Sequence, residues 1–323
     1  AIGALGVLFH GLFVAYTDFS QQTVLPMLGS ESVAHFYQWA SASLLILPQC
    51  VMLGATFPLL SAGLLRAQEE GVGEVLGGLY FSNSIGAAAG ALLTTFLILP
   101  LVGMPGTILT AGLLNIIVAL IAWAVWKAQS TRPAATEEAA KLSPVAPDPQ
   151  LRRLSMVLLV SAAITGATSF IYEIGWVRLL NQALGTTVHS FELMLAAFIL
   201  GLAFGGLWVR KHAARIGDVI AYAGVAQILM GISALLSIVA FAHSFHWVAW
   251  MMQALAKTDG GYTLFNLGGA VVSLLVMFPA AFFAGMTLPL FTLALLQKGG
   301  GEQVIGRVYA ANTLGAIVGV LLM

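Results

Sequence analysis

The composition of this chain excludes an ordinary soluble globular protein. Of its 323 residues, 59% are hydrophobic and only 8% are charged, whereas soluble domains carry about 25% charged residues. The formal net charge is zero, which argues against a nucleic-acid partner. The single cysteine, Cys50, excludes a disulfide framework and a cysteine-rich metal site. We therefore expect an integral membrane protein whose main partner is the lipid bilayer.

Long apolar runs follow one another along the chain, and a helix needs about 20 such residues to cross a bilayer. These runs predict membrane helices at Ile2–Tyr16, Phe36–Leu65, Val75–Leu101, Gly106–Trp126, Leu154–Leu180, His189–Val209, Val219–Ala242, Thr263–Leu296 and Val304–Met323. The segment Phe245–Ala256 is too short to span the bilayer. Its Trp247 and Trp250 predict a separate helix that lies along the membrane interface.

Residues 127–153 separate two groups of helices and are rich in proline, alanine and charge, which predicts a solvated linker. Most basic residues lie in turns on the same side as this linker: Arg66, Lys127, Arg132, Lys141, Arg152, Arg153, Arg210, Lys211, Arg215, Lys298 and Arg307. The positive-inside rule places that side in the cytoplasm. We expect a multi-pass protein of the cell's inner (plasma) membrane with a cytoplasmic linker.

The sequence also contains an internal repeat. The stretch LPQCVMLGATFPLL from Leu47 aligns with FPAAFFAGMTLPLF from Phe278, and GGLYFSNSIGAAAG from Gly77 aligns with GRVYAANTLGAIVG from Gly306. We expect an all-α, polytopic, major-facilitator-like bundle of two parallel repeats of about six helices each. Residues 1–126 would hold the last four helices of the first repeat, and residues 154–323 the first five of the second. Further helices are expected before residue 1 and after residue 323.

Several residues of the repeat have a predicted physical role. The glycine pairs Gly86/Gly90 and Gly315/Gly319 have the spacing that lets membrane helices pack closely. The polar residues Asn83 and Asn312 lie in mid-helix, where either a neighbouring helix or a substrate must satisfy them. Both interpretations remain open from the sequence.

Four stretches resemble a known family: GATSFIYEIGWVRLL, LGTTVHSFELMLAAFILGLAFGG, FFAGMTLPL and GRVYAANTLGAIVG. They are similar to the membrane portion of fused spermidine synthase-like proteins, in which major-facilitator-like helices are joined to an aminopropyltransferase-like domain. The resemblance covers almost all of the chain. It implies a membrane region that anchors a synthase-like domain and moves polyamine or a related metabolite.

The catalytic half of that family has no counterpart in these residues. No glycine-rich strand–turn–helix followed by an acid is present, and no paired aspartates in a soluble segment could deprotonate an amine. We therefore assign no catalytic residue, no cofactor and no metal ligand to this chain. Two other functions remain open, a stand-alone secondary transporter of a small organic cation and a non-catalytic subunit of a larger membrane complex.

The predicted helix Leu154–Leu180 carries two charges, Glu173 and Arg178, which cost free energy inside a membrane. The two residues are about 140° apart around the helix, so we expect separate partners. We predict an ion pair between Arg178 and Glu192 of the following helix. Glu173 is either an interhelical contact or the acid of a cavity for a cation or proton. In the second case aromatic walls would favour a cationic polyamine, and the candidates are Tyr172, Trp176, Tyr80 and Tyr309.

Overall fold

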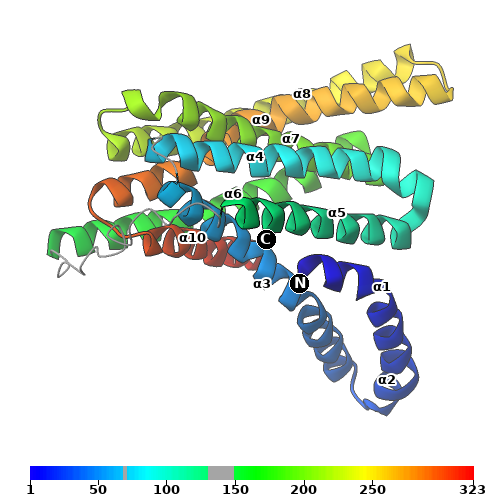
Figure 1. Ribbon diagram of the computed structural model, residues 1–323. Coiled ribbons are helices and arrows are strands. Elements are labelled where there is room, and N and C mark those ends of the chain that lie inside the picture. Colours follow the sequence, from blue (N-terminus) through cyan, green and yellow to red (C-terminus); the bar gives the residue numbers. More distant parts are fainter. Residues whose placement is uncertain (68–70, 130–148) are drawn as a thin grey trace. The chain divides into compact units, whose positions relative to one another are not determined.

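The computed structural model describes residues 1–67, 71–129 and 149–323, which form helices and turns without a β-strand. The helices are α1 (Ile2–Phe19), α2 (Leu25–Met27), α3 (Glu31–Ala67), α4 (Val72–Leu93), α5 (Leu99–Gln129), α6 (Pro149–Leu184), α7 (Val188–His212), α8 (Val219–Ala254), α9 (Asp259–Gln297) and α10 (Gln303–Leu322), with short π-helical turns η1 (Ser20–Val24) and η2 (Thr94–Ile98) and the 3-10 turn η4 (Ala213–Arg215) (Figure 1).

Within the described part of the chain, eight helical segments are long and apolar enough to cross a membrane. This confirms the predicted all-α, multi-pass architecture. The arrangement as two major-facilitator-like repeats remains a prediction. Most of the predicted linker, residues 130–148, lies outside the described residues.

The predicted break between residues 101 and 106 corresponds to a break in the helical backbone. Helix α4 continues through η2 into α5, and Gly103 there has φ 68° and ψ −179°. Glycine adopts this positive φ without the steric penalty that a Cβ would bring. The chain therefore turns between two apolar segments at a residue that permits it.

The predicted interfacial helix Phe245–Ala256 is wrong. Helix α8 runs without interruption from Val219 to Ala254. The reason is packing, because Val248 and Met251 are buried in the same apolar cluster as Ala234 on the preceding part of the helix. Buried contacts on both parts favour one continuous helix over a break at the interface.

The described residues form two compact units, of which the first comprises Ala1–Phe57 and Leu97–Ala146. In this unit α1 packs closely against α5, since a Cβ on Gly3 would lie 2.7 Å from the main-chain oxygen of Gly112. The Ser20 and Tyr37 hydroxyls hydrogen-bond at 2.9 Å. Close backbone packing thus joins α1 to α5, and a hydrogen bond between two hydroxyl groups joins η1 to α3.

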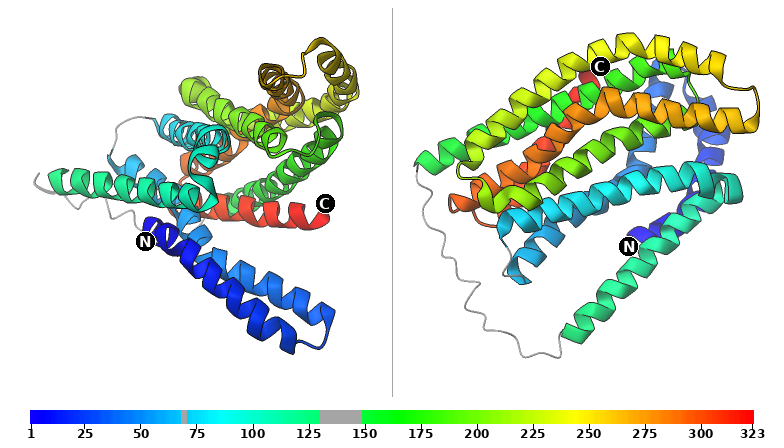
Figure 2. Two further views of the ribbon diagram at one scale, coloured as in Figure 1. Left: turned by 90° about the vertical axis from the view of Figure 1, so that its right-hand side faces the viewer. Right: turned by 90° about the horizontal axis from the view of Figure 1, so that it is seen from above.

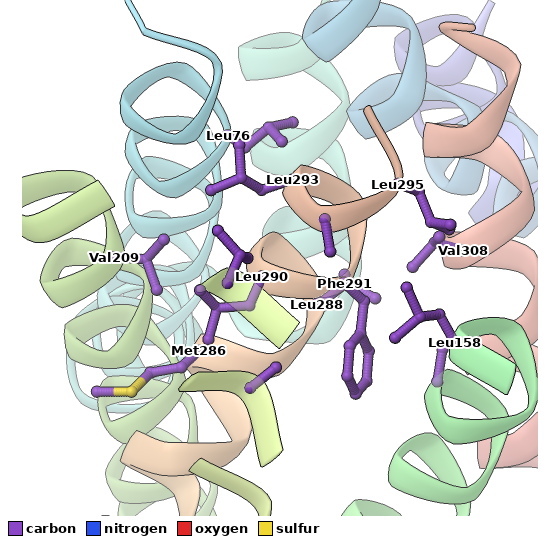
Figure 3. Packing of buried hydrophobic residues seen from close by; sticks show 14 of the residues in the cluster. Leu76, Leu158, Val209, Met286, Leu288, Leu290, Phe291, Leu293, Leu295 and Val308 are labelled. Carbon is purple, nitrogen blue, oxygen red and sulfur yellow. The ribbon is translucent and has the colours of Figure 1, made fainter. Parts of the chain in front are cut away.

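The second unit comprises Pro58–Phe96 and Pro147–Met323, and α9 is its central helix. Every residue from Ala284 to Leu295 is buried, and a helix that is apolar all round belongs inside a bundle. Figure 3 shows Leu290 and Phe291 of α9 packed among side chains from the surrounding helices: Leu76 of α4, Leu158 of α6, Val209 of α7 and Val308 of α10.

Helix α7 lies alongside α9 in this unit (Figure 2). A Cβ on Gly205 would come within 2.1 Å of the main-chain oxygen of Phe282, and one on Gly285 within 2.2 Å of that of Leu202. Only glycine permits this approach. The outer surface, in contrast, exposes large apolar side chains such as Leu235 and Trp250, as expected for contact with lipid.

Candidate functional site on helix α6

A row of five residues, three of them with hydroxyl or carboxylate groups, lies along the inner face of helix α6. Thr165, Ser169, Glu173, Trp176 and Leu180 follow at intervals of three or four residues, so they share one side of the helix. Thr165, Trp176 and Leu180 are buried, with 3%, 5% and 0% exposure. We call these five residues the inner row. Glu173 therefore faces the interior of the bundle and is half-buried there.

Trp176 is held in place by contacts with α6, α7 and α8. Its indole N–H donates to the Ser237 hydroxyl of α8 at 2.8 Å. Its ring stacks on Tyr172 with centroids 5.4 Å apart and approaches Phe198 of α7 at 6.3 Å. A buried tryptophan is stabilised when its N–H has a partner, so the aromatic pair is rigidly placed.

A cavity of about 250 Å³ lies between α6 and α8 beside this pair. Tyr172, Gly175 and Trp176 form the α6 side, and Ser237 and Phe241 lie on the α8 side. Its walls are apolar and aromatic except for the hydroxyl groups. Such a cavity suits the apolar part of a small amphiphilic or cationic molecule.

Glu173 is three residues from Trp176 on the inner row and does not line the cavity. In the described part of the chain its carboxylate has neither a hydrogen-bond donor nor an ion-pair partner. An acid at membrane depth normally finds a partner. This half-buried carboxylate is therefore available to a cation.

The predicted ion pair between Arg178 and Glu192 is wrong. Arg178 is exposed, and its guanidinium donates to the main-chain oxygen of Met323 at 3.0 Å. Glu192 is half-buried on α7. Arg178 lies about 140° around α6 from Glu173, on the side of the helix where its guanidinium reaches Met323 at the end of α10.

The four predicted aromatic wall residues are divided between two apolar clusters of the second unit. Tyr172 packs against the cluster that contains Trp176, whereas Tyr80 and Tyr309 pack against the cluster around Leu290. Tyr80 and Tyr309, which correspond in the repeat, thus pack against the same cluster. Of the four aromatic residues, only Tyr172 and Trp176 line the cavity beside α6.

The two asparagines occupy different environments. Asn312 lies where α10 crosses α6, and a Cβ on Gly166 would be 2.0 Å from its main-chain oxygen and 3.1 Å from its side-chain Oδ1. This contact favours a structural role for Asn312. Asn83 is exposed on α4, so the structure does not bring the two residues together as one site.

The sequence interpretation missed two polar residues of α8. The Gln227 amide donates to the Thr165 hydroxyl of the inner row, and Ser237 accepts from Trp176. Both are polar residues in an otherwise apolar run, and this pattern could have identified them from the sequence. They tie α6 to α8 above and below Glu173.

Among the described residues, no group of three or more histidine, cysteine, aspartate or glutamate side chains could hold a metal ion. No protein-family model, curated protein or solved structure matches this chain. The resemblance to spermidine synthase-like proteins therefore remains a prediction.

Proposed function

We propose that this chain is the membrane region of a spermidine synthase-like protein and that helix α6 binds an organic cation of the polyamine class. The observation that carries the proposal is the half-buried Glu173, which faces the bundle interior without a partner in the described part of the chain. Burial of an unpaired charge costs free energy, so a ligand that neutralises it is favoured.

The neighbouring aromatic residues suit the same ligand. The Tyr172–Trp176 stack borders an apolar cavity of about 250 Å³. Ammonium groups are attracted to aromatic faces, and methylene chains are stabilised by apolar walls. A polyamine combines both groups in one flexible molecule.

Binding of radiolabelled spermidine to the purified full-length protein tests this proposal. We expect saturable binding that falls by about tenfold or more in Glu173→Gln, because a close charge pair is lost. Glu192→Gln is the matched control, a second half-buried membrane glutamate on α7, and should bind as the wild type does. Equal affinity of wild type and Glu173→Gln would refute the proposed site.

The synthase-like part of the proposal has its own test. These residues account for 33.9 kDa, and the intact mass of the native polypeptide shows whether a soluble domain accompanies them. If it does, we expect aminopropyl transfer by the full-length protein. A native polypeptide without such a domain would favour a stand-alone transporter or a subunit of a larger complex.

A further inference from the structure

The basic end of the second unit contains a cavity that the cation site does not use. At this end lie the start of α6, the α7–α8 turn and the α9–α10 turn (Figure 1). The cavity, of about 430 Å³, is formed at the α7–α8 turn. Its lining includes His212, Arg215, Asp218, Ala221, Tyr222 and Val225.

The cavity presents hydrogen-bond donors that lack acceptors. The exposed guanidinium of Arg215 contacts no carboxylate among the described residues, whereas Arg66 at the same end is paired with Glu302. The Tyr222 hydroxyl accepts from the Trp208 indole at 2.7 Å. Its own proton has no acceptor within residues 1–67, 71–129 and 149–323.

The remaining ionisable groups leave the cavity suited to an anion. Asp218 is the one carboxylate of the lining, and its Oδ1 accepts the main-chain N–H groups of Ile220 and Ala221, both at 3.0 Å, as the N-cap of α8. The His212 ring interacts through Nδ1 with the Trp208 carbonyl at 2.9 Å, which leaves Nε2 for a ligand. Lys211 is exposed next to His212 and adds a further positive charge.

We propose that this cavity binds the phosphate of an anionic phospholipid. Arg215 and Tyr222 donate to the phosphate oxygens, because charge-assisted donors of this type bind phosphate strongly. Ala221 and Val225 on the next turn of α8 are exposed and apolar, which fits the glycerol and acyl chains. The polar end and the apolar wall together favour a lipid over a soluble phosphate. Basic pockets between membrane helices are known to hold such headgroups.

Native mass spectrometry of the full-length protein with phosphatidylglycerol and phosphatidylcholine tests this site. We expect preferential retention of phosphatidylglycerol. Its affinity should fall about fivefold in Arg215→Gln, the effect of one basic residue near a lipid surface, and should also fall in Tyr222→Phe. Arg215 has no ion pair to lose among the described residues, and Tyr222→Phe removes one exposed hydrogen bond, that from the Trp208 indole, so we expect both variants to fold and check this by thermal unfolding.

Arg307→Gln is the matched control. Arg307 is also exposed at the basic end, but its guanidinium interacts with Gln303 within α10 and is not in the cavity lining. Affinity for phosphatidylglycerol should remain at the wild-type value in this variant. An equal loss in Arg215→Gln and Arg307→Gln would mean diffuse surface attraction and would overturn the proposal. Displacement of the lipid by millimolar glycerol phosphate would identify a soluble ligand instead and would also overturn it.

Discussion

Helices α10 and α4 carry the same glycine spacing and have different surroundings. A Cβ on Gly315 of α10 would lie 1.7 Å from the main-chain oxygen of Ala163, so α6 packs directly on this position. At the aligned Gly86 of α4, no neighbouring helix of the same unit comes within 4 Å. The same difference holds one turn later for Gly319 and Gly90.

This difference shows that a glycine pair permits close packing but does not produce it. Close packing also depends on the neighbouring helix. Helix α6 presents small residues of its own to α10: Ala163, Gly166 and Ala167. Membrane helices associate where both surfaces let the backbones approach. The identical spacing on α4 therefore has a different energetic value within this unit.

The largest effect that this comparison predicts comes from a bulky residue in the packed pair. Gly315→Leu should lower the free energy of unfolding by about 3 kcal/mol, because α6 and α10 must separate to accept the side chain. Gly86→Leu, the matched change, should leave it unchanged or raise it by up to about 1 kcal/mol, because leucine favours helix over glycine. Unfolding in mixed detergent micelles measures both. A similar loss in the two variants would show that α4 is also covered, and the comparison would fail.

A single methyl group gives a sharper version of the same test. A Cβ on Gly319 would be 2.4 Å from the main-chain oxygen of Ala167, so Gly319→Ala should destabilise the fold by about 1–2 kcal/mol. Gly90→Ala meets no such contact and should be neutral or stabilising by up to about 1 kcal/mol, because alanine favours helix. A lower melting temperature for Gly319→Ala together with an unchanged or higher one for Gly90→Ala would support the comparison. A decrease in both variants would contradict it.

The smallest predicted effect concerns the ion pair between Arg66, at the end of α3, and Glu302, in the α9–α10 turn. The Arg66 Nε donates to Glu302 at 2.8 Å, and both side chains are solvent-accessible. Exposed pairs contribute little and are screened by salt. Arg66→Gln should therefore reduce stability slightly at low salt and not at 1 M salt, roughly the concentration at which the Debye length falls to 3 Å.

The pH dependence of this pair has a defined sign. The hydrogen bond and the charge of Arg66 lower the pKa of Glu302 below its ordinary value. The contribution is thus complete above the unfolded pKa of about 4.3 and is lost as the pH falls through the lower folded value. The difference between wild type and Arg66→Gln should shrink in acid. A difference that grew on acidification would contradict this assignment.

The sequence predicted the helices well because uninterrupted apolar runs have few alternatives in a membrane. The predictions from sequence were wrong where contacts with helices distant in the sequence determined the structure. The continuation of α8 past Phe245 depends on burial of Val248 and Met251 against other helices. The partner of Arg178 depends on the rotation of α6, and the division of Tyr80 from Tyr172 depends on which helices meet. None of these is encoded in local spacing.

The position of Glu173 on the inner face of α6 could be predicted only in part from the sequence. The helical period separates it from Arg178, but only the packed bundle identifies the face that carries Glu173 as the buried one. Gln227 and Ser237 were visible as polar residues in an apolar run, yet their partners on α6 follow from the crossing of two helices that are distant in sequence.

Binding of radiolabelled spermidine to proteoliposomes that contain the full-length protein tests the central claim most directly. The account predicts saturable binding by wild type and by Glu192→Gln, and a loss of about tenfold or more in affinity in Glu173→Gln with unfolding behaviour unchanged. Binding by Glu173→Gln with wild-type affinity would contradict the assignment of this carboxylate to cation binding.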